Sequence, residues 1–166
     1  MMKMVPRLAA DTGAAAAAEM ALVLPFMVAL LFAAIELGNF FLSEHVVQKG
    51  VRDAARYAAR LPMVDYAGCA ATAGAQQRIQ RVARTGDPDG AAGTRTHGWA
   101  DDSTVSVTVA CNTSGTYTGL YAEFPMGAPV VTVVAEVPYP SLFGFISTGD
   151  NSFMLNARSQ AAVFGA

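Results

Sequence analysis

The residues with the clearest chemical potential lie near the N-terminus, where an acidic side chain follows a run of alanines. Gly13 is followed by five alanines and Glu19, and the sequence then turns apolar through Leu42 with one further charge, Glu36. An acid within a membrane-crossing helix costs free energy, roughly 2.5–3.5 kcal/mol at the helix centre. Glu19 is therefore a candidate functional group that needs a charged partner. Glu36, about 25 Å further along the helix, is expected near the outer interface of the membrane, where it reaches water.

A proteolytic cut among the small residues would create that partner. Cleavage after Gly13 or after Ala14 would leave a new α-amino group about one helical turn before Glu19, given a rise of about 1.5 Å per residue. An ammonium and a carboxylate in a low-dielectric bundle of helices are tolerated only when they are matched. We therefore take Gly13, Ala14 and Ala15 as the candidate processing site and Glu19 as the residue that pairs with the amine.

The apolar run from Met20 to Leu42 is long enough to cross a bilayer, which takes about 20 residues of helix. Three interpretations compete: a cleaved secretory signal, an uncleaved signal anchor, and a leader cut before a membrane helix that is kept. The secretory signal fits poorly because the apolar run is long. In addition, Glu36 and Gly38 stand where the Ala-x-Ala motif of a signal-peptidase site is expected.

Basic residues flank the apolar run on both sides. Lys3 and Arg7 precede it and favour a cytoplasmic N-terminus. Four others follow it closely, namely Lys49, Arg52, Arg56 and Arg60. The positive-inside count therefore argues the other way. Orientation rests instead on the domain that follows and on the family resemblance described below.

Composition limits the classes of function. The chain is 53% hydrophobic and 14% charged, against roughly 25% charged residues in average soluble proteins, and its net charge is −2. Since no block of basic residues stands alone, a nucleic-acid partner has little support. The chain has two histidines and lacks GxSxG, HExxH and P-loop motifs. We therefore predict no enzyme activity, no catalytic residues, no cofactor and no metal site.

Apolar patterns downstream predict an α+β domain. The helix continues past Ser43 with an apolar stripe and ends near Pro62, and a second helix covers about 66–84. A loop follows at 85–102, in which Asp87 to Gly90 favours a turn over a calcium site. Strands are predicted at 105–111, 130–137 and 153–164. Together these elements predict a roughly three-stranded antiparallel sheet packed on the extended N-terminal helix.

Two other features leave alternatives open. The two cysteines, Cys69 and Cys111, form either one disulfide, as is usual in a translocated domain, or two buried thiols. The loop between Pro140 and Asn151 carries four large apolar residues, Leu142, Phe143, Phe145 and Ile146. These side chains either fold back onto the core or form a patch suited to a partner or a membrane surface.

Three stretches of the sequence resemble the TadE-like pseudopilin family of the tight-adherence (Tad) pilus system. They are the glycine–alanine stretch with Glu19-Met20-Ala21-Leu22-Val23-Leu24-Pro25, then Ile35-Glu36-Leu37-Gly38, then Asp53-Ala54-Ala55-Arg56-Tyr57-Ala58-Ala59-Arg60. Two features depart from the family pattern. Met20 stands where an aromatic residue is usual, and five residues rather than four separate Gly13 from Glu19. We favour cleavage between Ala14 and Ala15, because it makes Glu19 the fifth mature residue, the position that such proteins normally use.

The resemblance implies a minor pseudopilin-like component of a Tad-type pilus or secretion apparatus, needed for pilus assembly and surface adherence. It implies a cytoplasmic leader (1–13), a transmembrane helix (14–42) and a periplasmic or extracellular pilin-like domain (43–166). The implied location is the bacterial inner membrane, crossed once, with the N-terminus in the cytoplasm. The implied partners are a prepilin peptidase, other pilin or pseudopilin subunits through the N-terminal helix, and an inner-membrane assembly platform. The alternative is an uncleaved single-pass anchor that carries a periplasmic binding domain.

Overall fold

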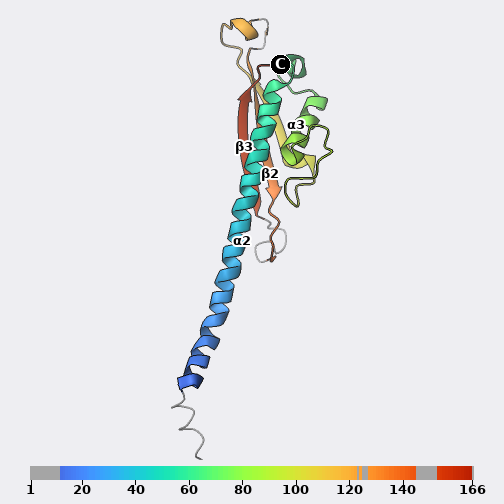
Figure 1. Ribbon diagram of the computed structural model, residues 1–166. Helices are drawn as coiled ribbons and strands as arrows, with labels where there is room; N and C mark the ends of the chain where they lie inside the picture. The colour runs from blue at the N-terminus through green and yellow to red at the C-terminus, as the bar shows by residue number, and fades with distance from the viewer. Residues whose placement is uncertain (1–11, 123, 125–126, 145–152, 166) are drawn as a thin grey trace, which may run out of the picture. The chain divides into compact units, whose positions relative to one another are not determined.

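The computed structural model describes residues 12–122, 124, 127–144 and 153–165. Its main elements are helices α2 (Thr12–Arg60) and α3 (Ala73–Thr85) and strands β1 (Val105–Cys111), β2 (Pro129–Pro138) and β3 (Met154–Ala162) (Figure 1). Short 3-10 turns occupy Met63–Tyr66, Asp102–Thr104 and Gly119–Tyr121. The predicted α+β class, with a long N-terminal helix and three strands, is confirmed.

Helix α2 passes through two compact units of the chain, Met1–Asn39 and Phe40–Ala166. The helix is rich in alanine and leucine, which are strong helix formers, and it continues through Pro25. It ends at Arg60, two residues before Pro62, as expected because the residue preceding a proline is disfavoured in the α conformation.

The three strands form one antiparallel sheet in the order β1-β2-β3. In the central row of the register, Val107 pairs with Val133, and Val133 pairs with Ser159. Alternate residues point to opposite faces of a strand, so one face of β2 carries Val131, Val133, Ala135 and Val137, all fully buried. The predicted strand positions are confirmed to within two residues at each end.

The core of the second unit lies between this sheet face and the C-terminal part of α2, which run side by side in Figure 1. The predicted apolar stripe of the helix is buried in the core: Val47, Val51, Ala54, Ala55, Ala58 and Leu61. The other faces of the same helical segment carry Lys49, Arg52 and Arg56, which are exposed. One side of this segment therefore supplies the apolar surface on which the sheet packs.

Helix α3 begins later than its predicted start at residue 66. Thr72 is its N-cap, with the hydroxyl accepting a hydrogen bond from the Ala75 backbone N–H at 3.3 Å, and Gly86 ends it in the left-handed conformation. The preceding segment turns at Gly68 and Cys69, both at positive φ, which cannot continue a right-handed helix. The apolar residues Ile79, Val82 and Ala83 of this helix are buried, but their spacing does not reveal the turn.

The predicted 85–102 loop is organised around a buried tryptophan. Trp99 is fully buried, and its indole N–H donates to the Thr104 hydroxyl at 3.0 Å. Arg84 donates to the backbone carbonyls of Trp99 and Ala100. Arg95 pairs with Asp53 of α2 at 2.9 Å. These contacts hold the loop against both helices.

Tyr66 fixes the turn that follows α2. Its hydroxyl donates to the Ala58 carbonyl oxygen at 2.6 Å, and the side chain is 3% exposed. Burial, reinforced by the neighbouring Asp65 carboxylate, raises the pKa of Tyr66 well above its ordinary value. The phenol therefore stays neutral at physiological pH and remains a hydrogen-bond donor.

Gly50 of α2 lies against Ala83 of α3 and the Trp99 ring. A Cβ atom at this position would lie 2.3 Å from the Ala83 carbonyl oxygen and 2.9 Å from the Trp99 ring. We expect Gly50→Ala to destabilise the globular unit by about 1–3 kcal/mol, because backbone must move to admit the methyl group. Denaturant unfolding of the detergent-solubilised chain, followed by Trp99 fluorescence, measures the change.

The matched control is Gly74→Ala in α3, where an added Cβ meets nothing within 4 Å. This substitution should be neutral or stabilise by up to about 1 kcal/mol, since alanine is the better helix former. Equal effects at Gly50 and Gly74 would contradict the close contact between the helices.

Candidate functional site

The predicted processing residues lie in the first turn of α2. The helix begins at Thr12, so the bonds after Gly13 and after Ala14 both lie within helical backbone. Most of the predicted 1–13 leader lies outside the described residues, and so does the side chain of Ala14. Gly13, Ala15 and Glu19 are all exposed.

Helix geometry distinguishes the two cleavage positions. Ala15 precedes Glu19 by four residues, which places the two on one face of the helix with a rise of about 6 Å. Ala14 precedes Glu19 by five residues, which gives a rise of about 7.5 Å and turns the amine away from that face. An N-terminus at Ala15 therefore aligns the amine with the carboxylate better than one at Ala14.

The part of α2 that follows Glu19 exposes apolar side chains on all its faces. Leu22, Phe26 and Leu30 are 71–72% exposed and lie along one row. Others lie on further rows: Val23 (49%), Leu24 (53%), Met27 (61%), Leu31 (58%), Ile35 (44%) and Leu37 (54%). A helix that is apolar all round is stable only inside a protein core, a helix bundle or a membrane.

Among the described residues, one helix is long and apolar enough to cross a membrane, within Ala15–Arg60. Only 6% of its most apolar window is buried within the structure, so it is not the covered core helix of a soluble domain. This feature fits a single-pass membrane protein, as the sequence predicts.

Residues 13–56 match the family model of TadE-like proteins. This segment of the chain is TadE-like. The match confirms the family resemblance inferred from the sequence, and it covers the predicted processing residues, Glu19, the apolar run and the first buried turns of α2 in the globular unit. No curated protein and no solved structure matches the chain.

Downstream of the TadE-like segment, Cys69 and Cys111 are joined by a disulfide with a Cα–Cα distance of 5.9 Å. The bond ties the turn before α3 to the end of β1. Alternation along β1 indicated that Cys111 faces the core side of the sheet, but the position of Cys69 depends on a turn that the sequence pattern did not show. In that turn Cys69 is the one described non-glycine residue at positive φ.

The acidic residues of the 85–102 loop serve local structure. The Asp87 carboxylate accepts hydrogen bonds from the backbone N–H groups of Asp89 and Ala91, each at 3.0 Å, which is the expected turn. The backbone N–H of Ser103 donates to Asp101 at 2.8 Å and lowers the pKa of that carboxyl. Within the described ranges, no group of three or more His, Cys, Asp or Glu residues could hold a metal ion.

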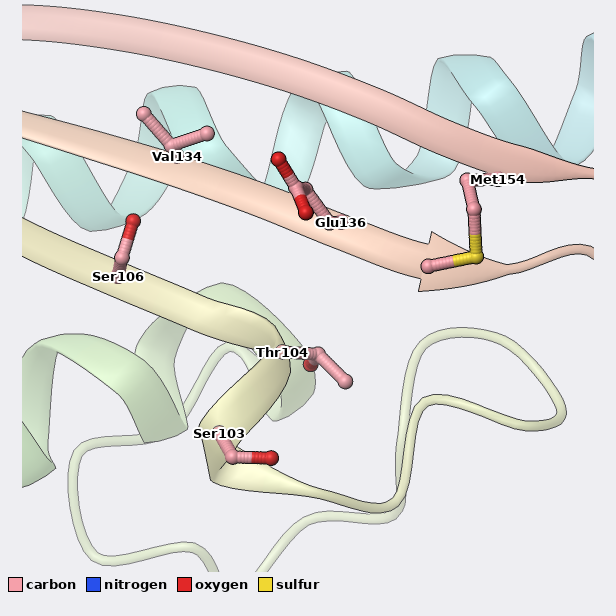
Figure 2. A pocket seen from close by; sticks show the side chains of 6 residues that line it. All are labelled: Ser103, Thr104, Ser106, Val134, Glu136 and Met154. Atoms are coloured by element: carbon pink, nitrogen blue, oxygen red, sulfur yellow. The ribbon is translucent and has the colours of Figure 1, made fainter.

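A cavity of about 300 Å³ lies on the sheet face opposite the core. Figure 2 shows the side chains that line it, from the Asp102–Thr104 turn, β1, β2 and the start of β3: Ser103, Thr104, Ser106, Val134, Glu136 and Met154. The Thr104 hydroxyl accepts a hydrogen bond from the Trp99 indole N–H and donates one to the backbone carbonyl oxygen of Asp101. Glu136 and Ser106 are exposed and supply hydrogen-bonding groups. Strand alternation places both on the outer face, but the register that brings them together could not be predicted.

Glu36 departs from its expected environment. Its position about 25 Å along the helix from Glu19, from the rise of 1.5 Å per residue, predicted a residue that reaches water. The side chain is instead 2% exposed. Helical rise gives only the height along the axis and says nothing about the groups that surround it, which is why the prediction was wrong.

The disulfide generates a test of redox state and stability. We expect non-reducing mass spectrometry of the exported protein to find a Cys69–Cys111 bridge. Because the bond closes a separation of 42 residues, its loss in the Cys69→Ser/Cys111→Ser variant should cost about 4 kcal/mol of unfolding free energy in the chain-entropy estimate. Dithiothreitol should destabilise the parent protein and leave the variant unchanged. Two thiols that react with an alkylating agent in the native protein would contradict the bridge.

Proposed function

We propose that this chain is a minor pseudopilin-like component of a Tad-type pilus or secretion apparatus, held in the bacterial inner membrane by α2. The observation that carries the proposal is the TadE-like match over 13–56, which coincides with the all-round apolar face of the helix. A Tad pilus-associated component is what the family match suggests. Processing, assembly and adherence are the further steps of the proposal.

In the first step, a prepilin peptidase removes the leader and leaves Ala15 at the N-terminus. The four-residue spacing supports this cut, because it sets the new amine on the same face as Glu19. The pair then supplies the matched charges that a low-dielectric helix bundle requires.

In the second step, α2 associates with the helices of other pilin subunits at the assembly platform. Ala29 with Ala33, and Ala34 with Gly38, repeat small residues at a spacing of four, and all four are exposed. Such spacing allows two helix backbones to approach closely in a membrane. An added Cβ at Gly38 meets nothing within 4 Å in the chain itself, so the surface is open to another helix.

The globular unit faces the periplasm or the exterior in this proposal. The disulfide supports that side, because such bonds persist in oxidising compartments and are rare in the cytoplasm. The basic residues after the apolar run favour the other side. However, whole domains are translocated largely regardless of their charge, so we give the disulfide more weight.

N-terminal sequencing of the protein from native membranes tests processing. With the peptidase present, we expect the mature chain to begin at Ala15, and a start at Ala14 would still support a pseudopilin. The control is a peptidase-deficient strain, in which Met1 or Met2 should remain. An intact Met1 or Met2 with the peptidase present would favour the uncleaved anchor instead.

The second test replaces the carboxylate of Glu19. We expect Glu19→Ala and Glu19→Gln to leave membrane insertion intact and to abolish pilus assembly and surface adherence, because the amine loses its matched charge. Piliation is measured by electron microscopy and insertion by resistance to alkaline extraction. Glu44→Ala is the matched control, since Glu44 follows the apolar run and accepts a hydrogen bond from Gln48 at 3.2 Å. Wild-type piliation in both Glu19 variants would remove Glu19 from the mechanism.

A further inference from the structure

Exposed apolar side chains gather at the end of the globular unit where α2 enters it. They are Phe41 (50% exposed), Leu42 (69%), Leu142 (57%), Phe143 (38%), Phe153 (58%) and Met154 (42%). We name these six residues the hairpin-end patch. The sequence left open whether Leu142 and Phe143 fold onto the core, and the structure shows both exposed. Phe145 and Ile146 lie outside the described residues.

Four contacts bring the parts of the patch together. The β2–β3 ladder ends at the pair Pro138 and Met154, and the Tyr139 backbone N–H donates to the Phe153 carbonyl oxygen at 2.8 Å. The Tyr139 ring packs edge-on against Phe40 of α2, with centroids 5.2 Å apart. Phe40 in turn contacts Phe41, with centroids 5.9 Å apart. The end of the hairpin is therefore joined to the point of α2 where the apolar run stops.

We propose that the hairpin-end patch lies in the interface of the lipid bilayer and rests the globular unit on the membrane. The argument is continuity: Phe41 and Leu42 are both the last residues of the apolar run and members of the patch. A chain that crosses the bilayer through this run must carry the patch at the membrane surface. The inference thus rests on the membrane span of the proposed function.

The chemistry of the patch favours lipid over a charged partner. None of its six side chains carries a charge, so its affinity comes from burying aromatic and aliphatic surface at the acyl boundary. Glu136, two residues before the end of β2, is exposed on the outer sheet face close by. A carboxylate there does not attract anionic headgroups. We therefore expect anionic lipid not to strengthen the contact.

Tryptophan quenching in bilayers tests the proposal. The chain has one tryptophan, Trp99, which is fully buried and gives a constant background. The full chain is reconstituted in phosphatidylcholine vesicles, with and without lipid brominated near the headgroup, as parent and as Phe143→Trp and Phe153→Trp. Both variants should lose about half or more of their added emission to the brominated lipid, as expected for rings at the interface.

Two matched variants complete the experiment. Phe164→Trp places the same ring at the opposite end of the unit: Phe164 is 47% exposed, and its backbone N–H bonds to Ala59, about 28 Å of helix beyond Phe40. It should show no quenching. Phe26→Trp, within the apolar run, should be strongly quenched and reports the membrane span itself. Non-reducing gels and circular dichroism confirm that each variant is folded.

The outcomes separate the two proposals. Quenching at Phe26→Trp with none at Phe143→Trp and Phe153→Trp would overturn the patch and leave the span intact. Blue-shifted emission at both patch positions without quenching would mean that protein covers the patch, which also overturns lipid contact. Absence of quenching at Phe26→Trp would overturn the membrane span and the patch together.

Discussion

The structure depends on one helix, α2, whose two halves require different surroundings. From Met20 to Leu37, α2 exposes apolar side chains on every face, which water does not tolerate over such a length. From Val47 to Leu61, the same helix buries one stripe and exposes charges on the others. The change occurs without a break in the backbone, so the helix hydrogen bonds are kept across the transition. Because the helix is continuous, its apolar half leads directly into the globular unit.

The globular unit is built against the amphipathic half of the helix. A three-stranded sheet has two faces, and only one of them is covered by apolar packing. Without the stripe of α2 beneath it, the valine-rich face of β2 would be open to water. Arg95 with Asp53, and Gly50 with Ala83 and Trp99, add contacts from α3 and its following loop. The C-terminal half of α2 is thus the centre of the fold of the globular unit.

Elements with a strong period could be predicted from the sequence. The apolar stripe of α2 and the alternation of β1 and β3 gave their faces correctly, because burial of one face imposes the period on the sequence. The start of α3 could not be predicted, since it depends on the turn at Gly68 and Cys69 and on the Thr72 cap. The burial of Trp99 at the centre of its loop was missed for a related reason. A single buried aromatic residue in a polar loop belongs to no repeating apolar pattern.

The spacing of the candidate processing residues could be predicted for the same reason. Gly13, Ala15 and Glu19 are close in sequence, so helical rise alone fixes their spacing. The surroundings of Glu36, the partners of the outer-face cavity and the gathering of the hairpin-end patch all depend on segments distant in the chain. Local spacing carries no information about such contacts. At the hairpin-end patch, these contacts are set by the sheet register and by the ring contact between Phe40 and Tyr139.

The disulfide also has a mechanical consequence. When a force is applied between α2 and β3, the load runs along the chain from one to the other. The bond between Cys69 and Cys111 carries that load past the 42-residue separation that contains α3 and the tryptophan loop. Roughly 140 Å of chain, at about 3.4 Å per extended residue, is thereby withheld from stretching. The segment between the two cysteines therefore does not extend under tension, even if the strands of the sheet separate.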